Sequence, residues 1–239
     1  MKRLSVYIVS LILLISIPFL FRLCKSVQKN KLVAAMDINF QDHDNLFLAQ
    51  EHIENLLIQN YGVLVNRPLL EIDINSIKTL IEKNPMIEHA NVFITLDRKI
   101  QISINQRLPL ARVKNAKMDF YLDTEGLEMP LSKNYTARVP LISGEVDRGD
   151  LADLFVLLKQ ITKSDYLHGI VTGINKHNSG DYSLETRLHG QRIELGLIEN
   201  LKEKFKKLEA FYNNAVENHK LEKYKVINLK YKNQVVCVN

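Results

Sequence analysis

The sequence predicts an α+β protein with an N-terminal transmembrane helix, then a β-α-α-β-β domain, then a mixed β domain with a long C-terminal helix and terminal edge strands. Three observations predict this fold. An apolar run without charges fills residues 4–21, two helical patterns lie among alternating segments over 32–105, and an amphipathic segment over 197–217 precedes two short strand patterns. At 239 residues and 46% hydrophobic content, the chain is typical of a globular protein with two ordinary domains.

Residues 4–21 are the most hydrophobic segment of the chain. Their 18 positions carry no charge, and a helix of that length extends about 27 Å, roughly the thickness of a hydrocarbon core. A cleaved signal peptide would need small residues at its cleavage site, whereas the run ends at Phe21 and Arg22. The same residues make a poor approach to a lipidated Cys24, and a buried core helix is a further alternative. We therefore predict an uncleaved anchor over residues 4–23.

The next 75 residues predict a compact α+β unit with a three-stranded sheet. Residues 32–41 alternate as a strand through Met36, Ile38 and Phe40. Two helices follow: the first is predicted from about residue 46 to residue 60, entered at Asp44 or Asn45 and left through Gly62, and the second runs from Asp73 or Asn75 to Pro85. Alternating apolar residues on either side of the turn at 97–98 then predict two paired strands.

The remaining residues predict a second, mixed β unit. A hairpin turn at 123–126 takes its unusual backbone angle from Gly126. A short extended stretch follows at 139–144. Helices are predicted at 150–163 and 197–217. Strands are predicted at 119–122, 127–130, 168–175, 181–188, 191–196, 224–230 and 234–238.

The charged and nucleophilic residues give no catalytic pattern. No phosphate-binding loop, zinc-protease motif or serine-hydrolase motif occurs. Glu51, His52 and Glu54 fit the polar face of a helix, the histidines lack ligand spacing, and Cys237 fits a small buried hydrophobe. The lysines between 202 and 207 interleave with glutamates, which predicts a solvated helix face. We therefore expect no cofactor, no metal and no small-molecule substrate.

The net charge of +5 also has a local origin. Residues 1–36 hold six Lys/Arg and no Asp/Glu, whereas the rest of the chain holds 26 Lys/Arg against 27 Asp/Glu. The basic residues therefore flank the apolar run, where they can meet anionic lipid headgroups. The folded part is nearly neutral, so nucleic acid is not an expected partner.

Five short motifs occur in order along the chain. The segment LIEKNPMIEHANV at 80–92 is similar to the motif of a POTRA domain, and IQISINQRLPLAR at 100–112 is similar to the motif that follows it. The remaining matches are YLDTEG at 121–126, PLISG at 140–144 and INLKY at 227–231. Together, the five resemble the motifs of the FtsQ/DivIB cell-division family. The resemblance implies a cytoplasmic tail at 1–3, the anchor at 4–23, a POTRA-like domain at 32–113 and an FtsQ-type β domain at 114–239.

This resemblance implies a non-enzymatic scaffold of the divisome in the inner membrane. It implies a single-pass protein whose C-terminal bulk lies in the periplasm at the division septum. The positive-inside count opposes that orientation, since two Lys/Arg precede the apolar run and four follow it. The implied partners are FtsB-like and FtsL-like division proteins, which bind the last strands of the second domain.

A terminal strand suits such binding because the unpaired N–H and C=O groups of a sheet edge can accept an added strand. Val235, Val236 and Val238 are β-branched and favour a strand, and Tyr231 corresponds to a family tyrosine at this edge. The predicted partner-binding residues are Lys230, Tyr231, Asn233, Gln234, Val235 and Val236. The alternative is a membrane-tethered periplasmic enzyme or ligand-binding protein unrelated to division, which a pocket with convergent polar groups would favour.

Overall fold

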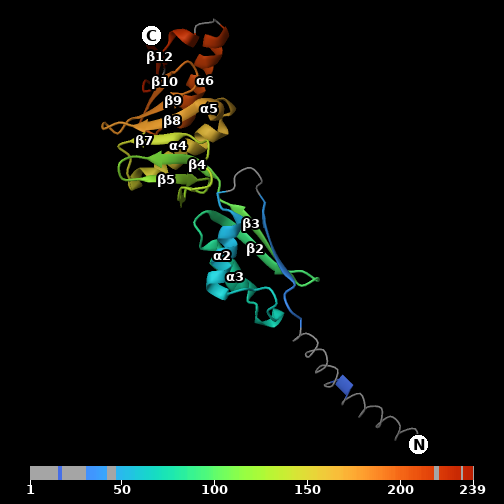
Figure 1. Ribbon diagram of the computed structural model, residues 1–239. Coiled ribbons are helices and arrows are strands. Elements are labelled where there is room, and N and C mark those ends of the chain that lie inside the picture. The colour runs from blue at the N-terminus through green and yellow to red at the C-terminus, as the bar shows by residue number, and fades with distance from the viewer. Residues whose placement is uncertain (1–15, 18–30, 42–46, 218–220, 233, 239) are drawn as a thin grey trace, which may run out of the picture. The chain divides into compact units, whose positions relative to one another are not determined.

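The computed structural model describes residues 16–17, 31–41, 47–217, 221–232 and 234–238, and it divides into two units between Gln106 and Arg107 (Figure 1). Of the predicted anchor, only Ser16 and Ile17 are described, and both are helical. Within these described ranges, no helix is both long enough and apolar enough to cross a membrane. The rest of the predicted anchor lies outside the described residues, as do Asp44 and Asn45. The first helix, predicted from about residue 46, begins only at Gln50, because Ala49 before it is extended.

The first unit is a three-stranded sheet with two helices. Its elements in chain order are β1 (Ala35–Phe40), α2 (Gln50–Tyr61), the 3-10 turn η1 (Leu69–Glu71), α3 (Ile74–Glu82), β2 (Ile87–Ile94) and β3 (Lys99–Gln106). The strand order is β1-β3-β2, with β3 parallel to β1 and antiparallel to β2. The predicted three-stranded α+β unit is therefore confirmed.

The local sequence explains these elements. The Asp73 carboxylate accepts hydrogen bonds from the backbone N–H groups of Asn75 and Ser76, which makes Asp73 the N-cap of α3. Alternate residues of β3 are buried, as expected for a strand with one face on the core. The core joins the isoleucines of β3 to the buried stripes of α2 and α3, at Ile53, Leu57, Ile77 and Ile81.

The second unit is built on a nine-stranded mixed sheet. Its strands are β4 (Pro109–Lys114), β5 (Asp119–Asp123), β6 (Glu128–Met129), β7 (Leu141–Gly144), β8 (Val171–Lys176), β9 (Tyr182–Thr186), β10 (Arg192–Gly196), β11 (Val226–Asn228) and β12 (Val236–Val238). They lie in the order β12-β11-β10-β9-β8-β7-β4-β5-β6. The helices are α4 (Leu151–Lys163), α5 (Asp165–Ile170) and α6 (Leu201–Glu217), with 3-10 turns η2 (Arg148–Asp150) and η3 (Leu221–Lys223). Their apolar faces share one core with the strands.

Two glycines of the second unit take backbone angles that side chains rarely adopt. Gly126 closes the β5–β6 turn with φ +82°, as its motif predicts. Gly144 ends β7 with φ +90°, and a Cβ built there would lie 2.1 Å from the backbone oxygen of Lys176 on the neighbouring strand. The glycine of the segment at 140–144 is thus required by a close backbone approach.

The structure corrects several predicted boundaries. The domain division predicted at 113/114 differs from that of the structure, at 106/107, because β4 pairs with β5 and β7 and so belongs to the second sheet. The strand predicted at 168–175 is wrong at its start, because α5 extends to Ile170. The long helix begins at Leu201 rather than residue 197, after Asn200 in a left-handed conformation with φ +51°.

Candidate partner-binding edge

The last strand, β12, lies at one end of the nine-stranded sheet (Figure 1). It pairs antiparallel with β11, with Cys237 opposite Ile227 and Val236 opposite Asn228. Its other side has no strand neighbour among the residues that the structure describes. The terminal strand therefore lies at a sheet edge, as predicted. An extended segment of another chain could pair with such an edge.

The side chains of the terminal segment alternate between the core and the surface. Val235 and Cys237 pack against the hydrophobic core of the unit. Val236 is half-buried, and Val238 is 55% exposed. Burial raises the pKa of the Cys237 thiol, which favours its protonated form and fits the role of a small hydrophobe. The strand is thus held to the fold through one face.

The turn between β11 and β12 carries the predicted tyrosine. The Tyr231 side chain is 50% exposed. The Lys207 ammonium, on α6, donates hydrogen bonds to the backbone oxygens of Tyr231, at 2.6 Å, and Lys232, at 3.1 Å. Gln234 is exposed, and Asn233 lies outside the described residues. The turn therefore presents an aromatic ring while its backbone is tied to the long helix.

Lys230 is directed into its own unit. Its ammonium lies 2.5 Å from an Asp181 carboxylate oxygen and 4.0 Å from one of Glu194, and the hydrogen bond to Asp181 raises the pKa of Lys230. The aliphatic part of the chain covers Gly196, where a built Cβ would lie 3.1 Å from the Lys230 Cγ. The structure thus uses this ammonium to hold the β11–β12 turn against β9 and β10.

Two lysines of α6 have roles that the sequence pattern did not indicate. Lys207 holds the turn, as described above. Lys204 is 8% exposed and donates a hydrogen bond to the backbone oxygen of Leu197 at 2.8 Å, and burial lowers its pKa. The predicted solvated lysine face is therefore wrong at Lys204. Helical spacing alone could not identify either role, because all three acceptors are backbone oxygens of irregular segments.

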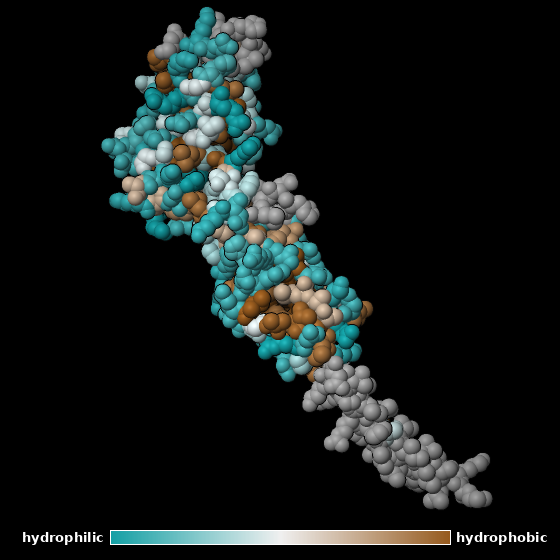
Figure 2. All heavy atoms as spheres, in the orientation of Figure 1, coloured by the Kyte–Doolittle hydropathy of each residue, from teal (hydrophilic) through white to brown (hydrophobic). Residues whose placement is uncertain are grey.

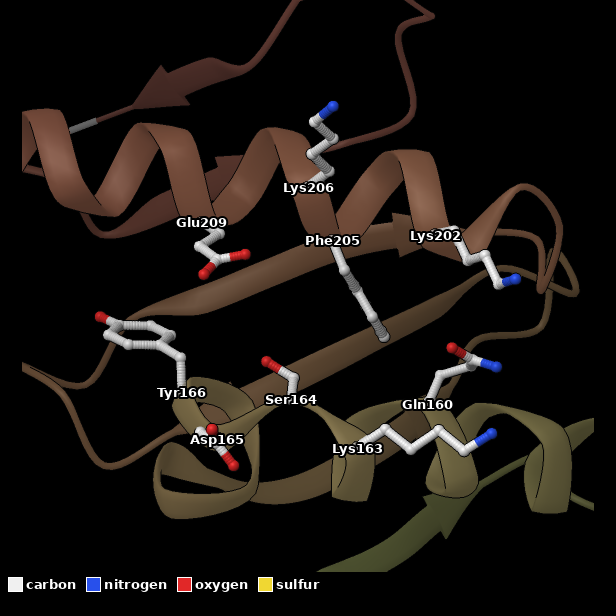
Figure 3. Close-up of a pocket in the computed structure, with 9 residues that line it drawn as sticks. All are labelled: Gln160, Lys163, Ser164, Asp165, Tyr166, Lys202, Phe205, Lys206 and Glu209. Atoms are coloured by element: carbon white, nitrogen blue, oxygen red, sulfur yellow. The ribbon is translucent and has the colours of Figure 1, made fainter.

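A separate groove of about 370 Å³ lies between α6 and the α4–α5 pair (Figure 3). In Figure 3, the ammonium groups of Lys163 and Lys202 lie at one end, whereas Asp165, Tyr166 and Glu209 lie at the other. The polar groups are thus spread along the groove instead of converging on one point. The structure places no group of three or more potential metal ligands within the described residues.

Comparisons with known proteins agree with the two units. The model of the FtsQ/DivIB C-terminal related family matches residues 108–238, and that of the POTRA-like domain matches residues 32–105. The comparison with curated proteins found no match. Because the first of these models spans more than half of the chain, the chain belongs to the FtsQ/DivIB family.

Proposed function

We propose that this protein is a single-pass scaffold of the divisome that binds partner division proteins through the open side of β12. Membership of the FtsQ/DivIB family makes it a cell-division protein. The finer proposal adds an anchor at residues 4–23 in the inner membrane, a folded part in the periplasm at the septum, and FtsB-like and FtsL-like partners. No catalytic step is part of this function.

One observation carries the proposal: β12 ends the sheet, and no other strand of the described residues pairs with its outer side. Strand addition at such an edge gives a partner backbone hydrogen bonds, and neighbouring side chains select its sequence. Tyr231 and Val238 are each about half exposed beside this edge, and an exposed aromatic residue is a common anchor in protein interfaces. The hydrogen bonds from Lys207 and Lys230 hold the β11–β12 turn in place in the unbound protein.

The sheet's other end supplies a matched control. β6 is a two-residue strand at the opposite edge, and Leu127 beside it is 49% exposed, against 55% for Val238. We expect Val238→Asp, or deletion from Tyr231 onward, to abolish capture of an FtsB-like partner, whereas Leu127→Asp leaves capture unchanged. Pull-down from cells measures this. Unchanged capture by both the deletion and Val238→Asp would rule out the edge.

Orientation has its own experiment. The positive-inside count favours a cytoplasmic bulk, whereas the proposal requires a periplasmic one. A reporter that is active only after oxidation, fused after Asn239, should be active in cells. An inactive reporter on a stable fusion would place the folded part in the cytoplasm and remove the septal proposal.

A further inference from the structure

Large exposed apolar side chains gather at one end of the first unit, which we call the β1 end. It is defined by Leu32, Val63, Leu70 and Leu96, whose exposed fractions are 40%, 65%, 66% and 105%. In Figure 2, apolar residues are concentrated on the lower part of this unit, where β1 begins in Figure 1. Isolated exposed leucines are ordinary, but a cluster at one end indicates a binding surface.

Backbone hydrogen bonds bring these segments together. The Leu69 N–H donates to the Lys31 oxygen at 2.9 Å, and Leu32 forms a β-bridge with Pro68. The Ala34 N–H donates to the Arg98 oxygen at 2.8 Å. The start of β1, the segment before α3 and the β2–β3 turn therefore meet at the β1 end.

The turn holds Leu96 outward in a fixed position. The Arg98 N–H donates to the Thr95 oxygen at 3.0 Å, and the Thr95 N–H donates to the Lys99 oxygen at 2.9 Å. Arg98 takes the left-handed conformation, with φ +65°, that such a tight reversal needs. Leu96 thus projects from a closed turn, so its exposure is a property of the fold.

The charges at this end are mixed. Lys31, Arg67 and Arg98 are exposed, and so are Glu71 and Asp97. Lys99 lies between two acids, 3.7 Å from Asp37 and 3.6 Å from Asp97. The apolar side chains therefore distinguish this end, and the long basic side chains can extend from it toward phosphate headgroups.

The apolar run at residues 4–21 lies close to the β1 end in the sequence. Phe21, the last residue of the apolar run, is ten residues from Lys31, and ten extended residues reach at most about 35 Å. Lys31 is itself bonded into the fold through its backbone oxygen. If residues 4–23 span a bilayer, as the proposed function requires, then the β1 end stays within that distance of the bilayer surface.

We propose that the β1 end docks on the surface of the bilayer that holds the anchor, with Leu96 and Leu70 inserted among the lipid headgroups and the first acyl carbons. The proposal rests on the anchor of the proposed function. Docking by this end directs β1 away from the bilayer and sets the orientation of the POTRA-like unit. Apolar side chains on a rigid tip and neighbouring basic residues are what such an interface uses.

The chain contains no tryptophan, so one introduced tryptophan is a clean reporter. The full chain carrying Leu96→Trp is reconstituted into vesicles of phosphatidylcholine and phosphatidylglycerol, with or without brominated acyl chains that quench tryptophan. The matched control is Glu88→Trp, which is also exposed and lies eight residues away at the start of β2, roughly 25 Å along the strand. We expect a blue shift and a loss of emission for Trp at position 96, and neither for position 88.

The outcomes separate the two proposals. A chain that does not float with the vesicles after alkaline extraction overturns both the anchor and the docking. A floating chain whose Leu96→Trp variant keeps unquenched, water-exposed emission overturns the docking alone. A blue shift without bromolipid quenching that grows with the protein-to-lipid ratio would assign the β1 end to a second copy of the chain. Equal quenching at positions 88 and 96 would overturn the assignment to this end.

Discussion

The bonds from Lys207 to the β11–β12 turn predict that one lysine of α6 controls the order of the edge strand. Lys207→Met keeps the length of the side chain and removes both hydrogen bonds, to the Tyr231 and Lys232 oxygens. A hydrogen bond from a charged donor contributes about 1.5–3 kcal/mol when it is buried, and less on the surface. Because the turn is exposed, we expect a total loss of about 1–2 kcal/mol in the local free energy of opening.

Hydrogen exchange measures that local opening. A loss of about 1–2 kcal/mol raises the population of the open form roughly 5- to 30-fold. Exchange in β11 and β12 should accelerate by that factor, whereas β9, inside the sheet, should keep its protection. Affinity for the strand-adding partner should fall by no more than the same factor, because binding would then include the ordering of β12.

Lys206→Met is the matched control. Lys206 is the preceding residue of the same helix and is exposed, and its side chain makes no hydrogen bond or ion pair with the described residues. The substitution removes the same charge without touching the turn, so exchange should be unchanged. If β12 is equally protected from hydrogen exchange in the Lys207→Met and Lys206→Met variants, the proposed role of Lys207 in ordering the edge strand is refuted. Lost protection across the whole second unit would equally contradict a local role.

Three further predictions concern the stability of the second unit. Gly144→Ala should cost at least about 4 kcal/mol, because its φ is +90° and the new Cβ would meet the Lys176 oxygen; urea unfolding measures this, and a loss below 1 kcal/mol would contradict it. Burial alone would raise the pKa of Asp150, but the hydrogen bond from the Asp147 N–H and the Lys176 ammonium, 2.6 Å away, outweigh burial, so the folded-state pKa lies below 3.8. The Asp150–Lys176 pair should therefore stabilise the fold above pH 3.8, and this stabilisation should decline as the pH falls through the lower folded-state pKa. Lys176→Met should make the free energy of unfolding depend less on pH in this acid range. Asp123→Asn should cost about 2 kcal/mol, because its amide NH₂ would face the Arg107 guanidinium in place of Oδ2, whereas Oδ1 would still accept the two backbone N–H bonds. Asp123→Ala should cost roughly twice as much, because it removes both carboxylate oxygens. Equal losses of stability for the two variants would contradict these separate roles of Oδ1 and Oδ2.

The predicted α+β unit at 32–105 was readable from the sequence because its local signals agree with its packing. The isoleucines of β3 alternate and are all buried, and the N-cap Asp73 and the residues before Pro85 bound α3 where the pattern predicts. Consistency between local preference and tertiary burial makes such a unit predictable. The helix α5 was missed because six residues with a glycine near the end give too short a pattern.

The second unit was less predictable because its pairings are between distant segments. β4 follows β3 after two residues, and nothing in its own pattern says that it pairs with β5 and β7 instead of the first sheet. The edge position of β12 agreed with a family expectation and with β-branched residues, but strand order itself is not written in local periodicity. The inward ion pairs of Lys230 depend on Asp181, 49 positions earlier.

In-cell photo-crosslinking from the terminal segment tests directly whether β12 is the binding edge. A photoreactive residue at Tyr231 or Gln234, which are both exposed, should give one adduct with an FtsB-like division protein in the full chain. The same residue at Leu127, on the opposite edge, should not. We expect this adduct only in dividing cells that contain the partner, and we expect it to be lost when Val238→Asp is added. Adducts of equal yield from position 127, or none from either terminal position on a folded chain, would contradict the proposal that β12 is the binding edge.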